Sequence, residues 1–194
     1  KLIDSWPLID DSQGWISHAS LARAKKMLER FSIFHQKSLS DNNRTVAGVE
    51  KSFEITVGRA LIRGNVDRIE VDSDGKHYII DFKTGKKEIS GDDAKSNLQL
   101  ACYQLGVVLD GFEEKLKSTD VTGAQLVYLA SKNKSYSTRE QDALVDVEAT
   151  TAILEEIAVG MGGATFTARK NDMCKQCKVK PSCPLYLEGK AVHQ

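Results

Sequence analysis

The chain has 194 residues, 41% of them hydrophobic and 28% charged, which is enough for one folded domain with a buried core. Lysine plus arginine and aspartate plus glutamate number 27 each, which excludes a protein that attracts nucleic acid through a global positive field. The sequence shows no apolar run long enough to span a membrane and no basic-then-apolar leader. We therefore expect neither a membrane anchor nor a signal peptide.

The first half of the chain is predicted to form a helix followed by three strands. Apolar side chains recur at helical spacing over 14–37, after an irregular start in which Trp6 and Pro7 dock on the body. A polar loop is expected over 38–45. Three runs rich in β-branched residues then predict strands, and an Asp-Gly turn separates the second from the third. The predicted strands are 46–57, 60–71 and 77–84.

The second half is predicted to add two helices and one strand. In chain order, we expect a helix over 93–109 capped by Asp92 or Asp93, a strand over 124–130, a mobile polar loop over 131–139, and a helix over 141–159 that ends at Gly160. This order predicts an α/β fold with helices flanking a central mixed β-sheet of four or more strands. We expect residues 1–164 to form this domain and residues 165–194 to be a cysteine-containing tail packed on it.

The predicted third strand carries two charged side chains on one face. Side chains alternate along a strand, so Asp81 and Lys83 point the same way as Ile79. The rest of this strand suits burial, and a buried charge is costly unless it is paired or has a function. Isolated Asp-x-Lys triplets are also common as salt-bridging residues at strand ends, which is the alternative interpretation.

A second acid, Asp67, lies on the preceding strand, and the turn decides whether it meets Asp81. Partners in antiparallel strands have a constant sum of residue numbers. A three-residue loop, 73–75, pairs Asp72 with Lys76 and places Asp67 opposite Asp81, whereas a two-residue loop turns Asp81 to the other face. We therefore predict an odd-numbered loop, or a bulge with the same effect.

Two carboxylates arranged in this way suit Mg²⁺ or Mn²⁺, which prefer hard oxygen ligands and leave positions for water and a phosphate oxygen. Asp67 and Asp81 are the predicted metal ligands. Lys83 is the predicted cation that orients a water or balances charge on a phosphate. Glu50 is a weaker candidate ligand, because an exposed glutamate on an edge strand is common.

Three motifs together resemble those of a nuclease family. They are Gly-x-x-Asp-Arg-Ile-Glu at 64–70, Ile-Ile-Asp-Phe-Lys-Thr-Gly-Lys at 79–86 and Gln-Leu-Ala-Cys-Tyr at 99–103. This combination resembles the RecB-type nucleases of the PD-(D/E)xK superfamily, in particular the C-terminal nuclease domains of AddAB- and AdnAB-type bacterial helicase–nucleases. The resemblance implies a restriction-endonuclease-like fold.

The resemblance also implies roles for five residues. In that family the first Asp and the Asp of Asp-x-Lys bind metal and the Lys is catalytic, which gives these roles to Asp67, Asp81 and Lys83. The family's Gln-x3-Tyr motif supports the active site and contacts the DNA backbone, and it maps to Gln99 and Tyr103. Helical spacing independently places the last two on one face of their helix.

The implied activity is that of a Mg²⁺- or Mn²⁺-dependent deoxyribonuclease domain, an exonuclease or endonuclease acting in DNA double-strand-break repair in the cytoplasm. The implied partners are single-stranded DNA, helicase motor domains in the same protein that feed the strand, and a partner subunit. A module that keeps the fold and binds DNA or a partner without cleaving is the alternative. A purely structural, cysteine-ligated domain would explain the tail but not the hairpin.

RecB-type nucleases also use a histidine from a Gly-x3-His helix well ahead of the first Asp. His18 matches this pattern formally, because Gly14 precedes it by four residues, but its surroundings do not resemble the family's block. His35 has no glycine four residues before it. We therefore expect the block to lie upstream of Lys1, which would leave this fragment alone weak or inactive.

Three cysteines close to the C-terminus, Cys174, Cys177 and Cys183, have the spacing of metal ligands, and we expect a reduced compartment rather than disulfides. Related nucleases hold a [4Fe–4S] cluster with such a trio and an earlier cysteine, so the resemblance implies an incomplete set here and a cluster in the full-length protein. Cys102 is expected to be a buried helix residue instead. His193 would complete a Cys3His zinc site, and free thiols in a disordered tail are the remaining alternative.

Overall fold

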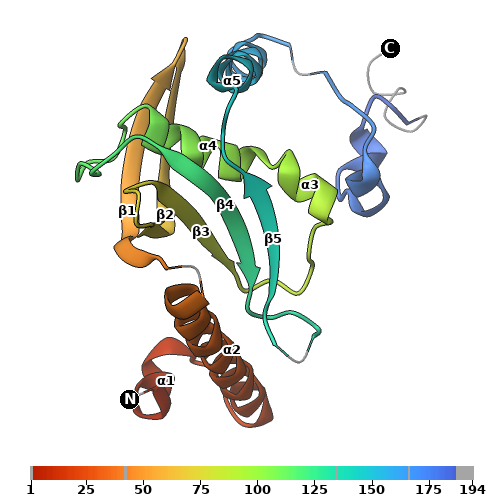
Figure 1. Cartoon of the computed structure of the whole chain (residues 1–194). Helices are drawn as coiled ribbons and strands as arrows, with labels where there is room; N and C mark the ends of the chain where they lie inside the picture. The colour runs from red at the N-terminus through yellow and green to blue at the C-terminus, as the bar shows by residue number, and fades with distance from the viewer. Residues whose placement is uncertain (1, 42, 134, 166, 187–194) are drawn as a thin grey trace.

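The computed structural model describes residues 2–41, 43–133, 135–165 and 167–186. Five strands form one sheet in the order β1-β2-β3-β4-β5. The β3–β4 pair is parallel, and the β1–β2, β2–β3 and β4–β5 pairs are antiparallel. Helices lie on both faces of this sheet (Figure 1), which confirms the predicted α/β fold class. None of the helices in the described ranges combines the length and apolarity needed to cross a membrane.

The strong periodic segments of the sequence are found as helices and strands. The elements are α1 (Leu2–Ile9), α2 (Trp15–Asp41), β1 (Thr45–Val57), β2 (Ala60–Val71), β3 (His77–Lys83), α3 (Gly91–Lys95), α4 (Leu98–Val108), β4 (Val121–Tyr128), β5 (Ser137–Asp142), α5 (Val147–Met161) and the 3₁₀ turns η1 (Asp172–Gln176) and η2 (Lys180–Ser182). The parallel β3–β4 pair needs a crossover, and α3 and α4 supply it.

The prediction of an irregular start is wrong, because residues 2–9 form α1. Of the two residues expected to dock, Trp6 is half-buried and its indole N–H donates to Ser17 Oγ of α2 over 3.1 Å, whereas Pro7 is exposed. No residue of α1 is buried. The helix has only eight residues and contains Pro7, which disfavours a helix interior, so the sequence did not predict it.

Two predicted boundaries in the second half are also wrong. The helix expected over 93–109 is two helices, because Asn97 interrupts it and caps α4 by accepting from Leu100 N over 3.1 Å. Residues 137–142, expected partly in the polar loop 131–139 and partly in the helix from 141, pair with β4 as the edge strand β5. The helix predicted from residue 141 accordingly begins only at Val147. An edge strand needs little apolar surface, which explains why the polar sequence of β5 gave no signal.

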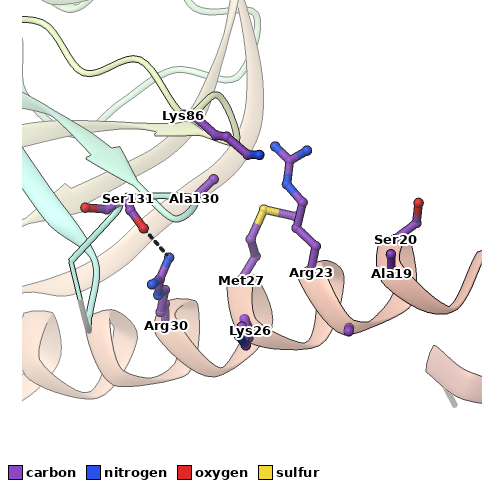
Figure 2. Close-up of a pocket in the computed structure, with 10 residues that line it drawn as sticks. Ala19, Ser20, Arg23, Lys26, Met27, Arg30, Lys86, Ala130 and Ser131 are labelled. Carbon is purple, nitrogen blue, oxygen red and sulfur yellow. Dashed lines mark hydrogen bonds between the residues drawn. The ribbon is translucent and has the colours of Figure 1, made fainter. Parts of the chain in front are cut away.

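The helix α2 covers one face of the sheet. Its Phe34 packs edge to face against Phe82 of β3, with ring centroids 5.6 Å apart. Its Arg30 donates from Nη1 to the carbonyl oxygens of Leu129, over 2.7 Å, and of Ser131, over 3.0 Å. Figure 2 shows the contact with Ser131. Apolar packing and a bidentate arginine therefore hold the helix against the end of β4.

A buried ionic network also joins α2 to β2. The Glu70 carboxylate is fully buried and accepts from Arg68 Nη2 over 2.5 Å and from Ser38 Oγ over 2.6 Å. Nη1 of the same Arg68 guanidinium lies 2.7 Å from His35 Nδ1. Because Arg68 is only 3% exposed, it cannot contact a phosphate at the surface. This network is structural.

We expect Glu70→Ala to destabilise the fold by about 3–5 kcal/mol, because it leaves the buried Arg68 guanidinium without its anion. Urea unfolding measures this cost. Glu54→Ala is the matched control, since it breaks the exposed pair between Glu54 and Arg63 and is expected to cost no more than about 1 kcal/mol. Equal costs for the two variants would contradict the network's role in docking α2.

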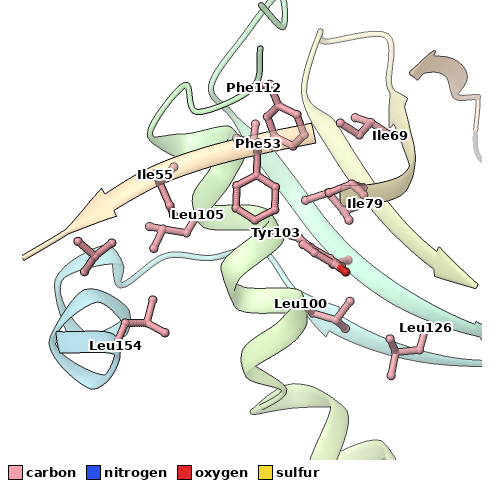
Figure 3. Close-up of a cluster of buried hydrophobic side chains, with 14 of the residues drawn as sticks. Phe53, Ile55, Ile69, Ile79, Leu100, Tyr103, Leu105, Phe112, Leu126 and Leu154 are labelled. Carbon is pink, nitrogen blue, oxygen red and sulfur yellow. The ribbon is translucent and has the colours of Figure 1, made fainter. Parts of the chain in front are cut away.

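The main core lies on the other face of the sheet, beneath α4 (Figure 3). Ile69 of β2 and Ile79 of β3 are fully buried there, as are Leu100 and Leu105 of α4. Leu154 of α5 reaches the margin of the same cluster. Each such side chain contributes about 1.5–3 kcal/mol through burial. This core holds α4 against the strands that carry Asp67 and Asp81.

Candidate active site

The hairpin has the register that the predicted site requires. Asp72 N donates to Lys76 O over 3.0 Å, which leaves the three-residue loop 73–75. The pairing continues in the same register to Arg68 and Ile80. The prediction of an odd-numbered loop is therefore confirmed, and the next step along the ladder brings Asp67 and Asp81 to the same level.

The two strands separate at that level. The β2–β3 pairs end at Arg68 and Ile80, whereas β3 stays paired with β4 as far as Lys83. Asp67 bridges the opening with its side chain: Oδ2 accepts from Phe82 N over 2.7 Å. A carboxylate oxygen of Asp67 thus accepts the hydrogen bond of a β3 backbone N–H, in place of a backbone carbonyl of β2. This hydrogen bond fixes Asp67 beside the end of β3.

Asp81, Lys83 and Gln99 form a closed ring of polar contacts. Lys83 Nζ lies 2.8 Å from Asp81 Oδ2 and donates over 2.8 Å to Gln99 Oε1. Gln99 Nε2 donates in turn to Asp81 Oδ1 over 3.1 Å. The amide of Gln99 therefore links the acid and the base of the Asp-x-Lys triplet. The Lys83 side chain is 32% exposed, so it remains within reach of a bound molecule.

Tyr103 supports this ring from the core. Its hydroxyl accepts from Gln99 Nε2 over 2.7 Å and donates to Asp81 Oδ1 over 3.3 Å. Its ring packs edge to face on Phe53, with centroids 5.9 Å apart. Burial raises the pKa of Tyr103, and the charges of Asp81 and Asp67 add to this effect. The hydroxyl therefore stays protonated and available as a donor.

Burial also raises the pKa of Asp81. The nearby negative charge of Asp67 acts in the same direction, while the Lys83 ammonium and the hydrogen bond from Tyr103 lower it. A buried carboxylate beside a second carboxylate is destabilised by desolvation and by repulsion between the two charges. A bound cation would reduce both effects.

The two carboxylates fit a divalent cation. Asp81 Oδ2 is buried, and although the Lys83 ammonium is near, no described group donates to this oxygen in good hydrogen-bond geometry. In the described parts of the chain, no three His, Cys, Asp or Glu side chains gather into a metal-binding group. Asp67 and Asp81 as the carboxylate ligands of a cation, with water and substrate oxygens completing its shell, stay a prediction. That is the usual binding mode of Mg²⁺ at phosphate-handling sites.

The family model of the PD-(D/E)XK nuclease superfamily matches residues 2–184 of the chain. The chain belongs to this superfamily. Among curated proteins, none matches it. A solved structure titled "Crystal structure of SSO0001" is similar, with 22% sequence identity and a TM-score of 0.40, covering 87% of this chain and 72% of that one. Members of the superfamily are generally nucleases and typically use divalent metal ions, which agrees with the donor set of the site.

The position of Gln99 in this superfamily member depends on a residue that the sequence pattern did not reveal. Gln141 of β5 donates from its buried Nε2 to the carbonyl oxygens of Ala94, Lys95 and Asn97, each over 3.1 Å. These carbonyls form the break between α3 and α4, two residues before Gln99. A single buried amide thus fixes the first turn of α4.

None of the histidines is hydrogen-bonded to the ring of Asp81, Lys83 and Gln99 in the described residues, whereas Glu50 lies opposite Asp67 in the β1–β2 register. His18 is exposed and lies in the corner between α1 and α2, and His35 is engaged with Arg68. His77 is buried at the opposite end of β3 from Lys83, and burial lowers its pKa. Glu50 is exposed and adopts a left-handed backbone with φ of 49°. Glu50 is thus exposed on the edge strand, and its role as a ligand stays a prediction.

The structure describes all four cysteines but does not test whether three of them bind a metal. Cys102 is partly buried, packs against the main core and has its pKa raised by burial, as expected for a helix residue. Cys174 lies in η1, where its Sγ accepts from Asn171 N over 3.3 Å. Cys177 and Cys183 follow η1 and η2 directly. His193 lies outside the described residues. The metal role of the trio stays a prediction.

We expect Asp81 to reduce the stability of the fold as the pH rises. Its folded pKa is raised above the ordinary value of 3.8, so its favourable contribution is complete below pH 3.8 and is lost as the pH passes the folded pKa. Asp81→Asn removes this dependence. Urea unfolding without divalent ions is therefore expected to show Asp81→Asn gaining stability over the wild type with rising pH.

The control is Asp92→Asn, because the Asp92 side chain is 94% exposed. Its stability relative to the wild type is expected to stay constant over the same pH range. An Asp81→Asn difference that is constant or reversed would show that burial does not control this carboxyl.

Proposed function

We propose that this chain is a metal-dependent deoxyribonuclease domain of the RecB type, which hydrolyses phosphodiester bonds in DNA. The single observation that carries the proposal is the ring of Asp81, Lys83 and Gln99 beside Asp67. The ring holds the buried Asp81 carboxylate against Lys83 and Gln99, which are open to solvent, and the charge of Asp67 acts on Asp81 from nearby. Phosphoryl chemistry needs such a combination.

Asp67 and Asp81 are the proposed metal ligands. A divalent ion bound there would supply Lewis acidity toward the phosphate and favour ionisation of water at neutral pH. The hydrogen bond from Phe82 N and the contacts from Gln99 and Tyr103 hold the two carboxylates in place before substrate arrives. The chain therefore provides a preorganised anionic pair, and no large rearrangement is required for binding.

Lys83 is the proposed catalytic residue. Its ammonium can donate a hydrogen bond to a non-bridging phosphate oxygen and so stabilise the negative charge that develops there. Gln99 Oε1 directs the ammonium, and Gln99 also lies where it can meet the DNA backbone. Tyr103 is a positioning residue, because it contacts Asp81 and Gln99 from the core side.

The proposed setting is a helicase–nuclease that acts in DNA double-strand-break repair in the cytoplasm. The proposed partners are a helicase motor in the same protein, which feeds a single strand to the site, and a second subunit. The support for this setting is the resemblance of the Gly-x-x-Asp, Asp-x-Lys and Gln-x3-Tyr motifs to those of AddAB- and AdnAB-type nucleases.

With Mg²⁺ or Mn²⁺ we expect cleavage of single-stranded DNA that is weak for this fragment and faster for a longer protein, and that stops when the metal is chelated. Lys83→Ala is expected to lower the cleavage rate by about 10²–10³-fold, as for the loss of one donor to a developing oxyanion. A gel assay of end-labelled oligonucleotides measures this rate. Lys76→Ala is the control, because Lys76 is exposed at the other end of β3 and is expected to leave the rate unchanged.

Each other outcome of that assay has a definite meaning. Undiminished cleavage by Lys83→Ala would move catalysis away from this site. DNA binding without cleavage by any form of the protein would favour the non-cleaving module. Cleavage seen only in a longer protein would support the expectation that a histidine-bearing block lies upstream of Lys1.

The proposed second cofactor is a [4Fe–4S] cluster in the full-length protein, with Cys174, Cys177 and Cys183 as three of its four ligands. The support for this is the resemblance of the cysteine spacing to that of related nucleases, since the bond from Asn171 N to Cys174 Sγ belongs to the capping box of η1. Purified full-length protein is expected to contain iron and labile sulfide, and Cys177→Ser is expected to lose both. Zinc without sulfide would instead indicate a Cys3His site with His193.

A further inference from the structure

A basic groove of about 680 Å³ lies between α2 and the two loops that follow β3 and β4. Its basic residues are Arg23, Lys26 and Arg30 of α2 and Lys86 of the loop after β3. Small side chains such as Ala22 and Ala130 line much of the rest, and the lining includes no carboxylate. The groove is therefore a concave positive surface on a chain whose net charge is zero.

Two arginines build the walls of the basic groove. Arg30 binds the carbonyl oxygens of Leu129 and Ser131 and so ties the loop after β4 to α2. Arg23 Nη2 donates to Thr84 O over 2.7 Å and so ties the loop after β3 to the same helix. Hydrogen bonds to carbonyl oxygens leave the guanidinium charges unneutralised. The walls are thus held in place and remain positive.

The two lysines of the groove have no anionic partner. In the described ranges, neither Lys26 nor Lys86 forms an ion pair with a carboxylate. Figure 2 shows the side chain of Lys86 extending toward Arg23 across the groove. Cations that face each other without an anion between them repel, and an anionic ligand would remove that repulsion.

The basic groove adjoins the candidate active site at the end of β3. Thr84, which Arg23 binds, directly follows Lys83 in the chain. Asp81 and Lys83 face α4, whereas the groove lies on the side of α2, so the end of β3 separates the two places. A polyanion bound at Lys83 could continue around this strand end into the groove; the Glu88 carboxylate lies beside the groove residue Ser131 and is paired with Arg139.

We propose that the basic groove binds the sugar–phosphate backbone of the nucleic-acid strand whose bond is cleaved at Lys83. This inference rests on the proposed nuclease function and adds to it a second contact region for the substrate. The lining contains no aromatic side chain on which a base could stack. Binding is therefore through phosphates and independent of base sequence.

The test compares two double variants that remove the same charge from the same elements. Lys26→Ala with Lys86→Ala removes both free lysines of the groove. Lys25→Ala with Lys87→Ala removes the adjacent exposed lysines, which do not line it. Fluorescence anisotropy with a labelled single-stranded oligonucleotide, in chelator and over a range of salt, measures affinity without cleavage.

The groove variant is expected to bind more weakly at low salt, by the same factor for two unrelated oligonucleotide sequences. A plot of log K against log salt has a negative slope. Its magnitude is expected to decrease by about 1.4 for the loss of two phosphate contacts, that is by about 0.7 for each single-strand contact. The neighbouring variant is expected to keep the wild-type slope. Equal slopes for the two double variants, or no binding by the wild type, would overturn the inference.

This assay is independent of the proposed reaction. If the slopes are equal but the wild type cleaves DNA with Mg²⁺, the groove inference fails and the nuclease function stands. If the groove variant alone loses affinity while no form cleaves, the groove is supported and the nuclease function fails.

Discussion

The carboxylate of Asp81 is buried in the sheet, and the rest of the site follows from the need to compensate it. Its partners come from two places, Lys83 on the same strand and Gln99 on α4. Because Gln99 must reach it from the first turn of a helix, the start of α4 has to be fixed. Gln141 on β5 does this by binding three carbonyls at the α3–α4 break. The site therefore depends on the edge strand as well as on the hairpin.

Because side chains alternate along the hairpin strands, the acids of the candidate site and the buried ion pair lie on opposite faces of the sheet. Asp67 and Asp81 face α4 and the exposed ring, whereas Arg68 and Glu70 face α2 and form a buried pair. A slip of one residue would exchange the two sets, exposing the buried pair and burying the acids on the wrong side. One turn register thus determines both how the helix is docked and where the acids lie.

Much of the fold follows from local patterns. The strands 60–71 and 77–83 and the helix α4 were predictable because their apolar residues match a strand or helix period strongly. The element α1 was not, because it is short and contains Pro7, and β5 was not, because all its residues are polar. The burial of Arg68 is not visible in the sequence either, because a charged residue in a motif gives no sign of burial until its partners are known.

The sequence by itself determined that Asp81 and Lys83 share one face of their strand, because side chains alternate along a strand. The structure decided that the loop has three residues, which brings Asp67 level with Asp81. Only the tertiary structure decided that Gln99 links the acid to the lysine, because that contact joins a strand to a helix across the crossover. It likewise decided that Lys86 lies against α2 in a basic groove. Local patterns record the faces of single elements, whereas contacts between elements depend on how the chain packs.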